Sequence, residues 1–438
     1  MEKQLSFFER YAAIIKIATI GILILLLLIP SSMIQGLIRE REQNQDEVKD
    51  EISSKWGKAQ TISGPIVTIP YVVNIKNVNG TIEKTTKNIH LLPENLDIVG
   101  QLDTVERHRN IYKLIAYSTS LQFKGNFSTE ELKSIGVSEQ DILWDQASLN
   151  MGVTDLGGIT DNISVKFGSD TFNFNPGLDN KDNFYSGVSA PITMAPSITK
   201  DFSFVLNIKG SESIHFLPVG KVTKVHLTSK CPNPSFDGKF IPEKHNTDNK
   251  GFDAQWKILH LNRNFPQAWR NNEQEINENG FGVSLMLDVD HYQKTMRSAK
   301  YAILFIAMTF LSFFFIEILN KKRIHPIQYI LIGLVLVLFY VLLLSFSEQF
   351  GFDLAYLISS LAVVVLITVY TASVLQSRQK TLVMLGILTV LYAFIYIIIQ
   401  MAEYSLLFGS VGLFLFLAAV MLASRKVDWY SIGEKVDE

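Results

Sequence analysis

The chain has 438 residues, with 40 Lys and Arg against 42 Asp and Glu and a formal net charge of -2. Its 47% hydrophobic content and single cysteine exclude a disordered, collagen-like or disulfide-dense chain, and the charge gives no basis for nucleic-acid binding. These averages hide two unlike parts. From Tyr301 onwards, 8 basic and 8 acidic residues make the chain about 12% charged, whereas the preceding part is about 22% charged.

Six apolar windows are each long enough to cross a bilayer, whose hydrocarbon core of about 30 Å needs about 20 apolar residues. Five such helices in succession with short joints would leave a soluble protein no polar surface. The first window is either a retained anchor or a cleaved signal peptide, and its long apolar run favours the anchor. We predict spans at residues 12–30, 300–320, 327–346, 354–376, 381–399 and 406–424.

The basic residues of the short joints predict the orientation of these spans. Lys and Arg follow the second, fourth and sixth spans, whereas the joints at 347–353 and 400–405 hold only acidic charges. This alternation places residues 1–11 and the tail 425–438 in the cytoplasm, and residues 31–299 outside the membrane.

The external segment 31–299 is long enough to form a domain with its own core. Apolar residues at helical spacing from Ile34 to Trp56 predict a helix that continues out of the first span, and its apolar stripe is expected to dock on its own domain, on another subunit or on lipid headgroups. Gly57 and Gly64-Pro65 end that pattern. Strand-like runs follow at 66–75, 222–229 and 283–289, and Pro70 points to an edge or a bulge in the first of them.

Catalytic signatures are missing from the sequence, which has no nucleophile elbow, metalloprotease helix, phosphate loop or Cys-x-x-Cys. No two of the eight histidines are three to five residues apart, as a compact zinc site would favour. We therefore predict no catalytic residues, no metal and no cofactor, with an envelope enzyme as the open alternative.

Polar residues at the ends of the spans are the other candidates, because polar groups are costly in lipid and often mark function. Glu317 precedes Lys321 by four residues, the favourable order for a helical ion pair, and is expected to snorkel to the interface. Glu348, Gln400 and Glu403 follow the third and fifth spans, and their shared side predicts an external polar vestibule. A transporter or channel is the alternative that this vestibule favours.

Several strings resemble the CreD family of cell envelope integrity inner membrane proteins. The resemblance begins at LIREREQNQDEVKDEISSKWGKAQTISGPIVTIPY (37–71) and is densest from residue 300 to 356, where HPIQY and LLLSFSE are specific. His325, Gln328 and Tyr329 belong to the first of these strings, in which Pro326 suits the first turn of a helix. Asn110 stands where the family pattern leads us to expect Gly, and Cys231 where we expect Trp.

This resemblance implies an integral inner-membrane protein of bacteria, linked to a two-component system and to tolerance of colicins and β-lactams. It brings no established catalytic residues. We therefore predict an α+β membrane protein with six transmembrane helices and a large β-rich periplasmic domain, acting by binding or scaffolding. The expected partners are membrane lipids and an envelope protein or cell-wall component, and His325 is expected to meet anionic headgroups or a cytoplasmic partner.

Overall fold

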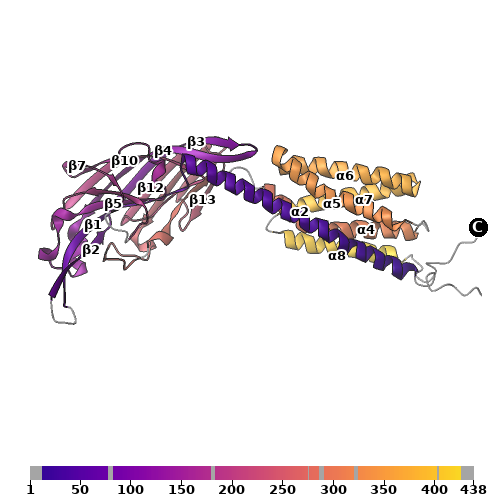
Figure 1. The fold of residues 1–438 in the computed structure, drawn as a ribbon, viewed down its shortest axis with the longest axis horizontal. Coiled ribbons are helices and arrows are strands. Elements are labelled where there is room, and N and C mark those ends of the chain that lie inside the picture. The colour runs from indigo at the N-terminus through magenta and orange to yellow at the C-terminus, as the bar shows by residue number, and fades with distance from the viewer. Residues whose placement is uncertain are drawn as a thin grey trace, which may run out of the picture. The chain divides into compact units, whose positions relative to one another are not determined.

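The computed structural model describes residues 12–76, 82–178, 183–274, 276–285, 291–319, 324–401 and 404–425. The chain divides into a helical unit, built from residues 1–45 and 290–438, and a β domain of residues 46–289 (Figure 1). The predicted N-terminal segment 1–11 and residues 426–438 of the predicted tail 425–438, together with Lys321 and Glu403, lie outside the described residues.

A helix occurs at each of the six windows that the sequence marks as a span. The helices are α2 (Ala12–Trp56), α3 (His291–Lys300), α4 (Ala302–Leu319), α5 (Pro326–Phe350), α6 (Phe352–Leu375), α7 (Arg378–Gln400) and α8 (Ser405–Ser424). In the described ranges, four of them are long and apolar enough to cross a membrane alone, and α3 and α4 qualify as one pair bent by 45°. The structure thus supports four spans, or five if the bent pair is one span, and the count of six stays a prediction.

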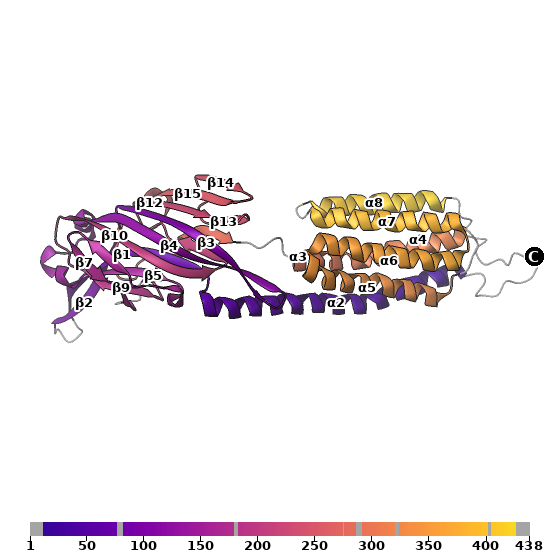
Figure 2. The same cartoon turned by 90° about the horizontal axis from the view of Figure 1, so that it is seen from above.

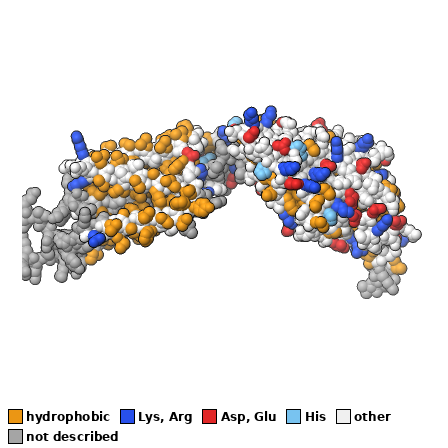
Figure 3. Space-filling view, turned by 180° about the vertical axis from the view of Figure 1, so that it is seen from behind, with side chains coloured by type: hydrophobic (Ala, Val, Ile, Leu, Met, Phe, Trp, Pro, Cys, Tyr) orange, Lys and Arg blue, Asp and Glu red, His pale blue; other side chains and the backbone are white. Residues whose placement is uncertain are grey.

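Apolar side chains and small residues set the packing of the helical unit. Figure 3 shows hydrophobic side chains over the face of this unit, as expected of a surface in contact with lipid. Inside it, a Cβ added to Gly333 of α5 would lie 2.2 Å from Cδ1 of Leu27 on α2. Gly333 thus lets these two helices approach closely, the usual role of small residues between membrane helices.

Two β-sheets form the β domain around one apolar core. In the described ranges the first sheet has nine strands in the order β13-β17-β11-β1-β5-β9-β8, with β2 paired to β1 and β16 paired to β2. These strands are β1 (Gln60–Lys76), β2 (Ile82–Leu91), β5 (Ser148–Val153), β8 (Asn175–Pro176), β9 (Gly187–Pro191), β11 (Ser213–Phe216), β13 (Pro234–Gly238), β16 (Ala268–Arg270) and β17 (Phe281–Leu285). β1 pairs with β2, β5 and β11, so it is the centre of this sheet.

The second sheet has eight strands in the described ranges, in the order β14-β15-β12-β3-β4-β10-β6-β7. They are β3 (Asn95–Arg109), β4 (Tyr112–Ser128), β6 (Ser164–Phe167), β7 (Asp170–Asn173), β10 (Thr199–Ser211), β12 (Val222–Ser229), β14 (Lys244–Asp248) and β15 (Gly251–Leu259). Figure 2 shows the long strands β3, β4 and β10 side by side. Buried and exposed residues alternate along β15 from Phe252 onwards and along much of β3 and β4, so one face of this sheet lies on the core and the other faces solvent.

The described parts of the three segments that the sequence predicts as strands all lie within observed strands. Residues 222–229 are β12, residues 66–75 lie inside β1, and residues 283–285 lie in β17, while residues 286–289 are outside the described ranges. The last pair of β1 with β5 joins Thr68 and Ser148, and Pro70 lies beyond it. The missing backbone N–H of Pro70 therefore costs no hydrogen bond to β5. The expected bulge is in the same strand but earlier, between Ser63 and Ile66.

The end of α2 docks on the β domain. The guanidinium of Arg107 and the ammonium of Lys209 lie 4.2 and 4.6 Å from the centre of the Trp56 ring, and the Trp56 indole N–H donates to the Tyr117 carbonyl at 3.2 Å. Gly57 ends the helix with a φ of +146°, and a Cβ there would lie 2.7 Å from the Lys209 carbonyl oxygen. At this end, the apolar stripe of the predicted helix therefore contacts its own domain.

Asn110, one of the two departures from the family pattern, lies in the two-residue turn between β3 and β4 with a φ of +56°. Glycine adopts positive φ without cost, and Asn tolerates it better than other residues with a side chain. Asn110 therefore fills the conformational requirement that a glycine would fill, and the departure leaves the hairpin intact.

An ion pair beside this turn joins the hairpin to α2. The carboxylate of Glu51 accepts hydrogen bonds from the Arg109 guanidinium and from the Lys55 ammonium, the latter at 2.7 Å. The hydrogen bond from Arg109, followed by that from Lys55, lowers the pKa of Glu51 from 4.5 to about 2. Because the Glu51 side chain is 39% exposed, solvent and salt screen this pair.

We expect the Glu51 contact to make stability depend on pH. The folded-state pKa lies below the ordinary value of 4.5, so the stabilisation is present above pH 4.5 and is lost as the pH falls towards about 2. Thermal unfolding of the full-length protein in detergent should show Glu51→Gln melting below the natural protein at pH 7. That difference should shrink below pH 4.5, whereas Glu139→Gln, another exposed glutamate of the domain, serves as the control. A difference in melting temperature that stays constant from pH 7 down to about pH 3 contradicts this assignment to Glu51.

Candidate functional site

Glu317, a residue singled out from the sequence, is a buried carboxylate at which three parts of the helical unit meet. Its side chain is 4% exposed and lies in the last turn of α4. It pairs with Lys16 of α2, accepts from the Tyr329 hydroxyl of α5 at 3.0 Å, and accepts from the Ile324 backbone N–H at 2.8 Å. The carboxylate is thus held by donors from α2, from the chain before α5 and from α5 itself.

Among the described residues, Lys16 is the ion-pair partner of Glu317. The predicted partner, Lys321, lies outside the described residues, whereas Lys16 is 301 positions away in the sequence. A pocket of about 290 Å³ adjoins the pair, between α2 and the start of α5, and its lining includes Lys16, Thr19 and Tyr329. Pairing offsets much of the cost of holding the two charges at a helix interface.

His325 and Gln328 cap the first turn of α5. The Ile327 backbone N–H donates to His325 Nδ1 at 3.3 Å, and the His325 backbone N–H donates to Gln328 Oε1 at 3.0 Å. Pro326 is the first helical residue, as predicted from the missing N–H. This reciprocal arrangement is a capping box, so the HPIQY string has a structural role in starting α5.

Glu348 and Gln400 both contact α3, but at different residues. Glu348 accepts from the Tyr292 hydroxyl at 3.0 Å. Gln400 accepts from the Lys294 ammonium at 2.9 Å and donates to Asp353 and to the Tyr396 hydroxyl. Glu403, the third member of the predicted vestibule, lies outside the described residues. The structure thus brings Glu348 and Gln400 to the same helix without joining them in one hydrogen-bonded group of described residues.

Three strands of the first sheet bring His215, Asp237 and Ser284 together. His215 Nε2 lies 2.5 Å from Asp237 Oδ1, and the Ser284 hydroxyl donates to Asp237 Oδ2 at 2.6 Å. A nucleophilic serine needs the imidazole as its own neighbour, with the carboxylate beyond it. Here the carboxylate lies between the other two groups, so the order is wrong for a catalytic triad. Among the described residues, no group of three or more His, Cys, Asp or Glu is placed to hold a metal ion.

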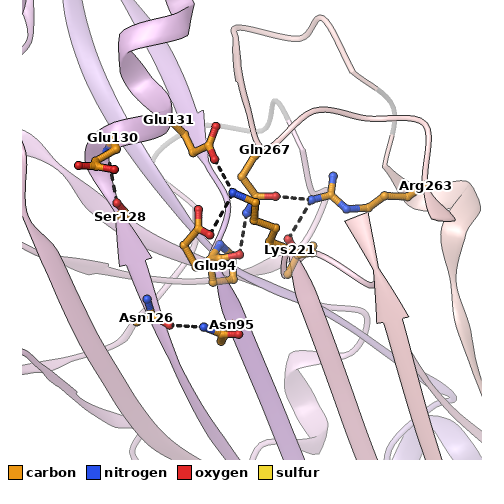
Figure 4. A network of polar contacts seen from close by, with 11 residues as sticks. Glu94, Asn95, Asn126, Ser128, Glu130, Glu131, Lys221, Arg263 and Gln267 are labelled. Carbon is orange, nitrogen blue, oxygen red and sulfur yellow. Dashed lines mark hydrogen bonds and ion pairs between the residues drawn. The ribbon is translucent and has the colours of Figure 1, made fainter. Parts of the chain in front are cut away.

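A network of polar contacts ties the starts of β3 and β12 to neighbouring loops (Figure 4). The Lys221 ammonium donates to Glu131 at 2.7 Å and pairs with Glu94 at 3.2 Å. These contacts raise the pKa of Lys221, with the Glu131 hydrogen bond as the largest cause. Lys221 is thereby satisfied inside the domain and acts as a clamp between loops.

Arg263 completes this network from the loop before β16. Its guanidinium donates to the Phe265 carbonyl at 2.5 Å and to Gln267 Oε1 at 2.6 Å, and the Gln267 amide donates to the Pro93 carbonyl at 2.6 Å. Burial lowers the pKa of Arg263 from 12.5 to about 10. Its partners are neutral, and because they accept several of its N–H groups, the residue pins the loop to the sheet edge.

The exposed face of the second sheet contains a groove of about 430 Å³ over β4, β10 and the start of β6. Five of its nine lining residues carry amide or hydroxyl side chains, one is a lysine and three are apolar. The lining residues are Gln122, Phe123, Lys124, Asn162, Ser164, Ser203, Phe204, Val205 and Asn207. Such a mixture of donors and acceptors on an open surface can bind a polar ligand.

Sequence reasoning missed this groove, because its residues come from segments up to 85 positions apart, from Gln122 to Asn207. The only local signal is the alternation of polar and apolar residues along β4 and β10, which marks a solvated face without marking a hollow in it. Lys16 can be recognised in the sequence as a charge inside an apolar window, but its pairing with Glu317 cannot.

The sequence matches the family model described as inner membrane protein CreD over residues 12–430. It is 31% identical over 417 residues to the inner membrane protein CreD of Escherichia coli strain K12. The match covers 94% of this chain and 92% of that relative. Neither description names a catalytic activity.

We expect Lys16 and Glu317 to be energetically coupled. Lys16→Met leaves a buried carboxylate without its ammonium and should destabilise the protein by about 2 kcal/mol, less than for a fully buried pair because Lys16 is partly exposed. Adding Glu317→Leu should restore part of the loss, and Lys16→Arg should keep most of the stability. Thermal unfolding of the natural protein, Lys16→Met, Glu317→Leu, the double variant and Lys16→Arg in one detergent measures the coupling. Losses that simply add in the double variant would show that the pair does not interact.

Proposed function

Because the chain belongs to the CreD family of inner membrane proteins, we propose that it supports envelope integrity and the envelope stress response as a membrane-anchored binding protein. In this proposal the apolar helices anchor the chain and the β domain binds an envelope component. No step of the proposed function is catalytic.

The groove on the second sheet is the observation that carries this proposal. It lies on the solvent-facing side of a sheet whose opposite face packs on the core. Three amide side chains, those of Gln122, Asn162 and Asn207, line it, and the Asn207 amide is held by Asp161 at 3.0 Å. A face that only needed to be soluble would require charge on its surface but no concave arrangement of amides and hydroxyls.

Anchoring, rather than conduction, is the role that we propose for the helical unit. Glu348 and Gln400, the residues predicted to line an external vestibule, are hydrogen-bonded to Tyr292 and Lys294 of α3. Glu317 is likewise held by three donors. Polar groups that are satisfied in this way stabilise a helix bundle and favour an anchor over an ion path.

We further propose that both termini lie in the cytoplasm and that the β domain lies in the periplasm. The short joint at Gly351, between α5 and α6, should then be periplasmic, whereas Ser377, between α6 and α7, should be cytoplasmic. A reporter enzyme that is active only outside the cytoplasm should be active when fused after Gly351 and inactive when fused after Ser377. The opposite pattern would invert the proposed orientation.

Loss of the protein should weaken the envelope. We expect a strain without the gene to be more sensitive to detergent, to a β-lactam or to osmotic shock, and the natural chain to restore resistance. A Gln122→Leu/Ser203→Leu variant, which alters the groove, should restore it less well than Thr228→Val, a change on the same sheet away from the groove. Membrane levels of each variant are measured by immunoblot. Unchanged resistance of the deletion strain to all three challenges refutes the envelope role.

A further inference from the structure

Lysines line up across the exposed face of the second sheet. The strand registers place them in one row, which we call the lysine row and define as Lys257 on β15, Lys224 on β12, Lys124 on β4 and Lys166 on β6. Lys224 lies directly opposite Lys257, and Asp97 and Ser203 occupy the positions between the other members. All four lysine side chains are exposed.

The charge of this row is compensated only in part, because its four ammonium groups face a single carboxylate within the row, that of Asp97, opposite Lys224 and Lys124. Like charges directly opposite each other on neighbouring strands are destabilising, so the Lys224–Lys257 pair costs stability. Within the part of the chain that the structure describes, none of the four lysines forms an ion pair. By contrast, His226 on the same face lies 3.1 Å from Asp253. The row is therefore a place where the sequence maintains positive charge at a cost.

The row is long enough for an extended ligand. Neighbouring strands are about 4.8 Å apart, so lysines two strands apart are separated by about 10 Å. From β15 to β6 the row crosses five strand intervals, which corresponds to about 24 Å. A single small anion would reach one or two of these ammonium groups, whereas a chain of anionic units can reach all of them.

The groove continues from the row and adds a second kind of chemistry. Lys124 belongs to both, and Ser203 lies between Lys124 and Lys166 in the register while also lining the groove. Amides and hydroxyls such as those of Gln122 and Asn162 donate and accept hydrogen bonds, which matches sugar hydroxyls. Their acceptor oxygens disfavour direct contact with a dense polyanion such as polyphosphate.

We propose that this face binds an extended anionic oligosaccharide, with sugar hydroxyls in the groove and acidic groups along the lysine row. The inference rests on the proposed binding function and names its ligand class. Each ammonium contributes a modest, salt-screened attraction, and the combination of the row with the groove at its β4–β6 end gives the selectivity.

Fluorescence anisotropy on the full-length protein in neutral detergent tests the proposal. The probe is labelled oligogalacturonate, and the comparison probes are a neutral maltooligosaccharide of equal length and polyglutamate. We expect oligogalacturonate to bind about tenfold more tightly than either, and its affinity to fall as salt is added. Equal binding of the neutral sugar removes the role of the lysine row. Equal binding of polyglutamate removes the role of the groove and overturns the assignment to a sugar.

Variants separate the two parts of the site. Lys124→Gln/Lys166→Gln should weaken oligogalacturonate binding about tenfold without changing maltooligosaccharide binding, whereas Gln122→Leu should weaken both. Lys84→Gln, an exposed lysine of β2 in the first sheet, is the matched control. An effect of Lys84→Gln as large as that of the row variant would reduce the result to overall charge and overturn the proposal. The deletion phenotype is independent of this outcome, so a failure here leaves the envelope role to be judged separately.

Discussion

The close approach of Gly57 to the backbone of Lys209 is the constraint on which the β domain depends. The two chains meet there because Gly57 has neither a Cβ nor a barrier to positive φ. Only three residues later the chain enters β1, the strand with which β2, β5 and β11 all pair. The position of the whole first sheet is therefore set by a junction at which Trp56 is held between two cations and a backbone carbonyl.

The two units handle charge in opposite ways. In the helical unit, Glu317 is neutralised by Lys16 and surrounded by further donors, because an isolated charge would be costly between apolar helices. On the second sheet of the β domain, water lowers the cost of unpaired ammonium groups, and four lysines form no ion pair among the described residues. In the helical unit the polar groups around Glu317 bind one another, whereas the lysines on this face of the β domain can bind a ligand.

Sequence patterns predict those features that are encoded locally. Residues 222–229 alternate in burial and are rich in β-branched residues, so β12 was predictable to its ends. β14, with the sequence KHNTD and no buried residue, carries no such signal. It is a strand because its backbone pairs with the edge strand β15. The Lys16–Glu317 pair and the lysine row were beyond prediction for the same reason. Both depend on how segments far apart in the chain pack together. The ion pair depends on helix packing, and the lysine row depends on strand register.

The parallel pairing of β1 with β11 also constrains how the domain folds. Gln60 is paired with Ile214, so the centre of the first sheet stays open on one side until more than half of the domain has been synthesised. β17 then closes over β11 at residues 281–285, immediately before the chain returns to the helical unit. A ribosome that stalls before β17 would release a domain with an exposed strand edge, the kind of surface on which chains aggregate. Completion of the sheet thus directly precedes synthesis of the remaining apolar helices, so the last strand of the domain decides when its edge is covered.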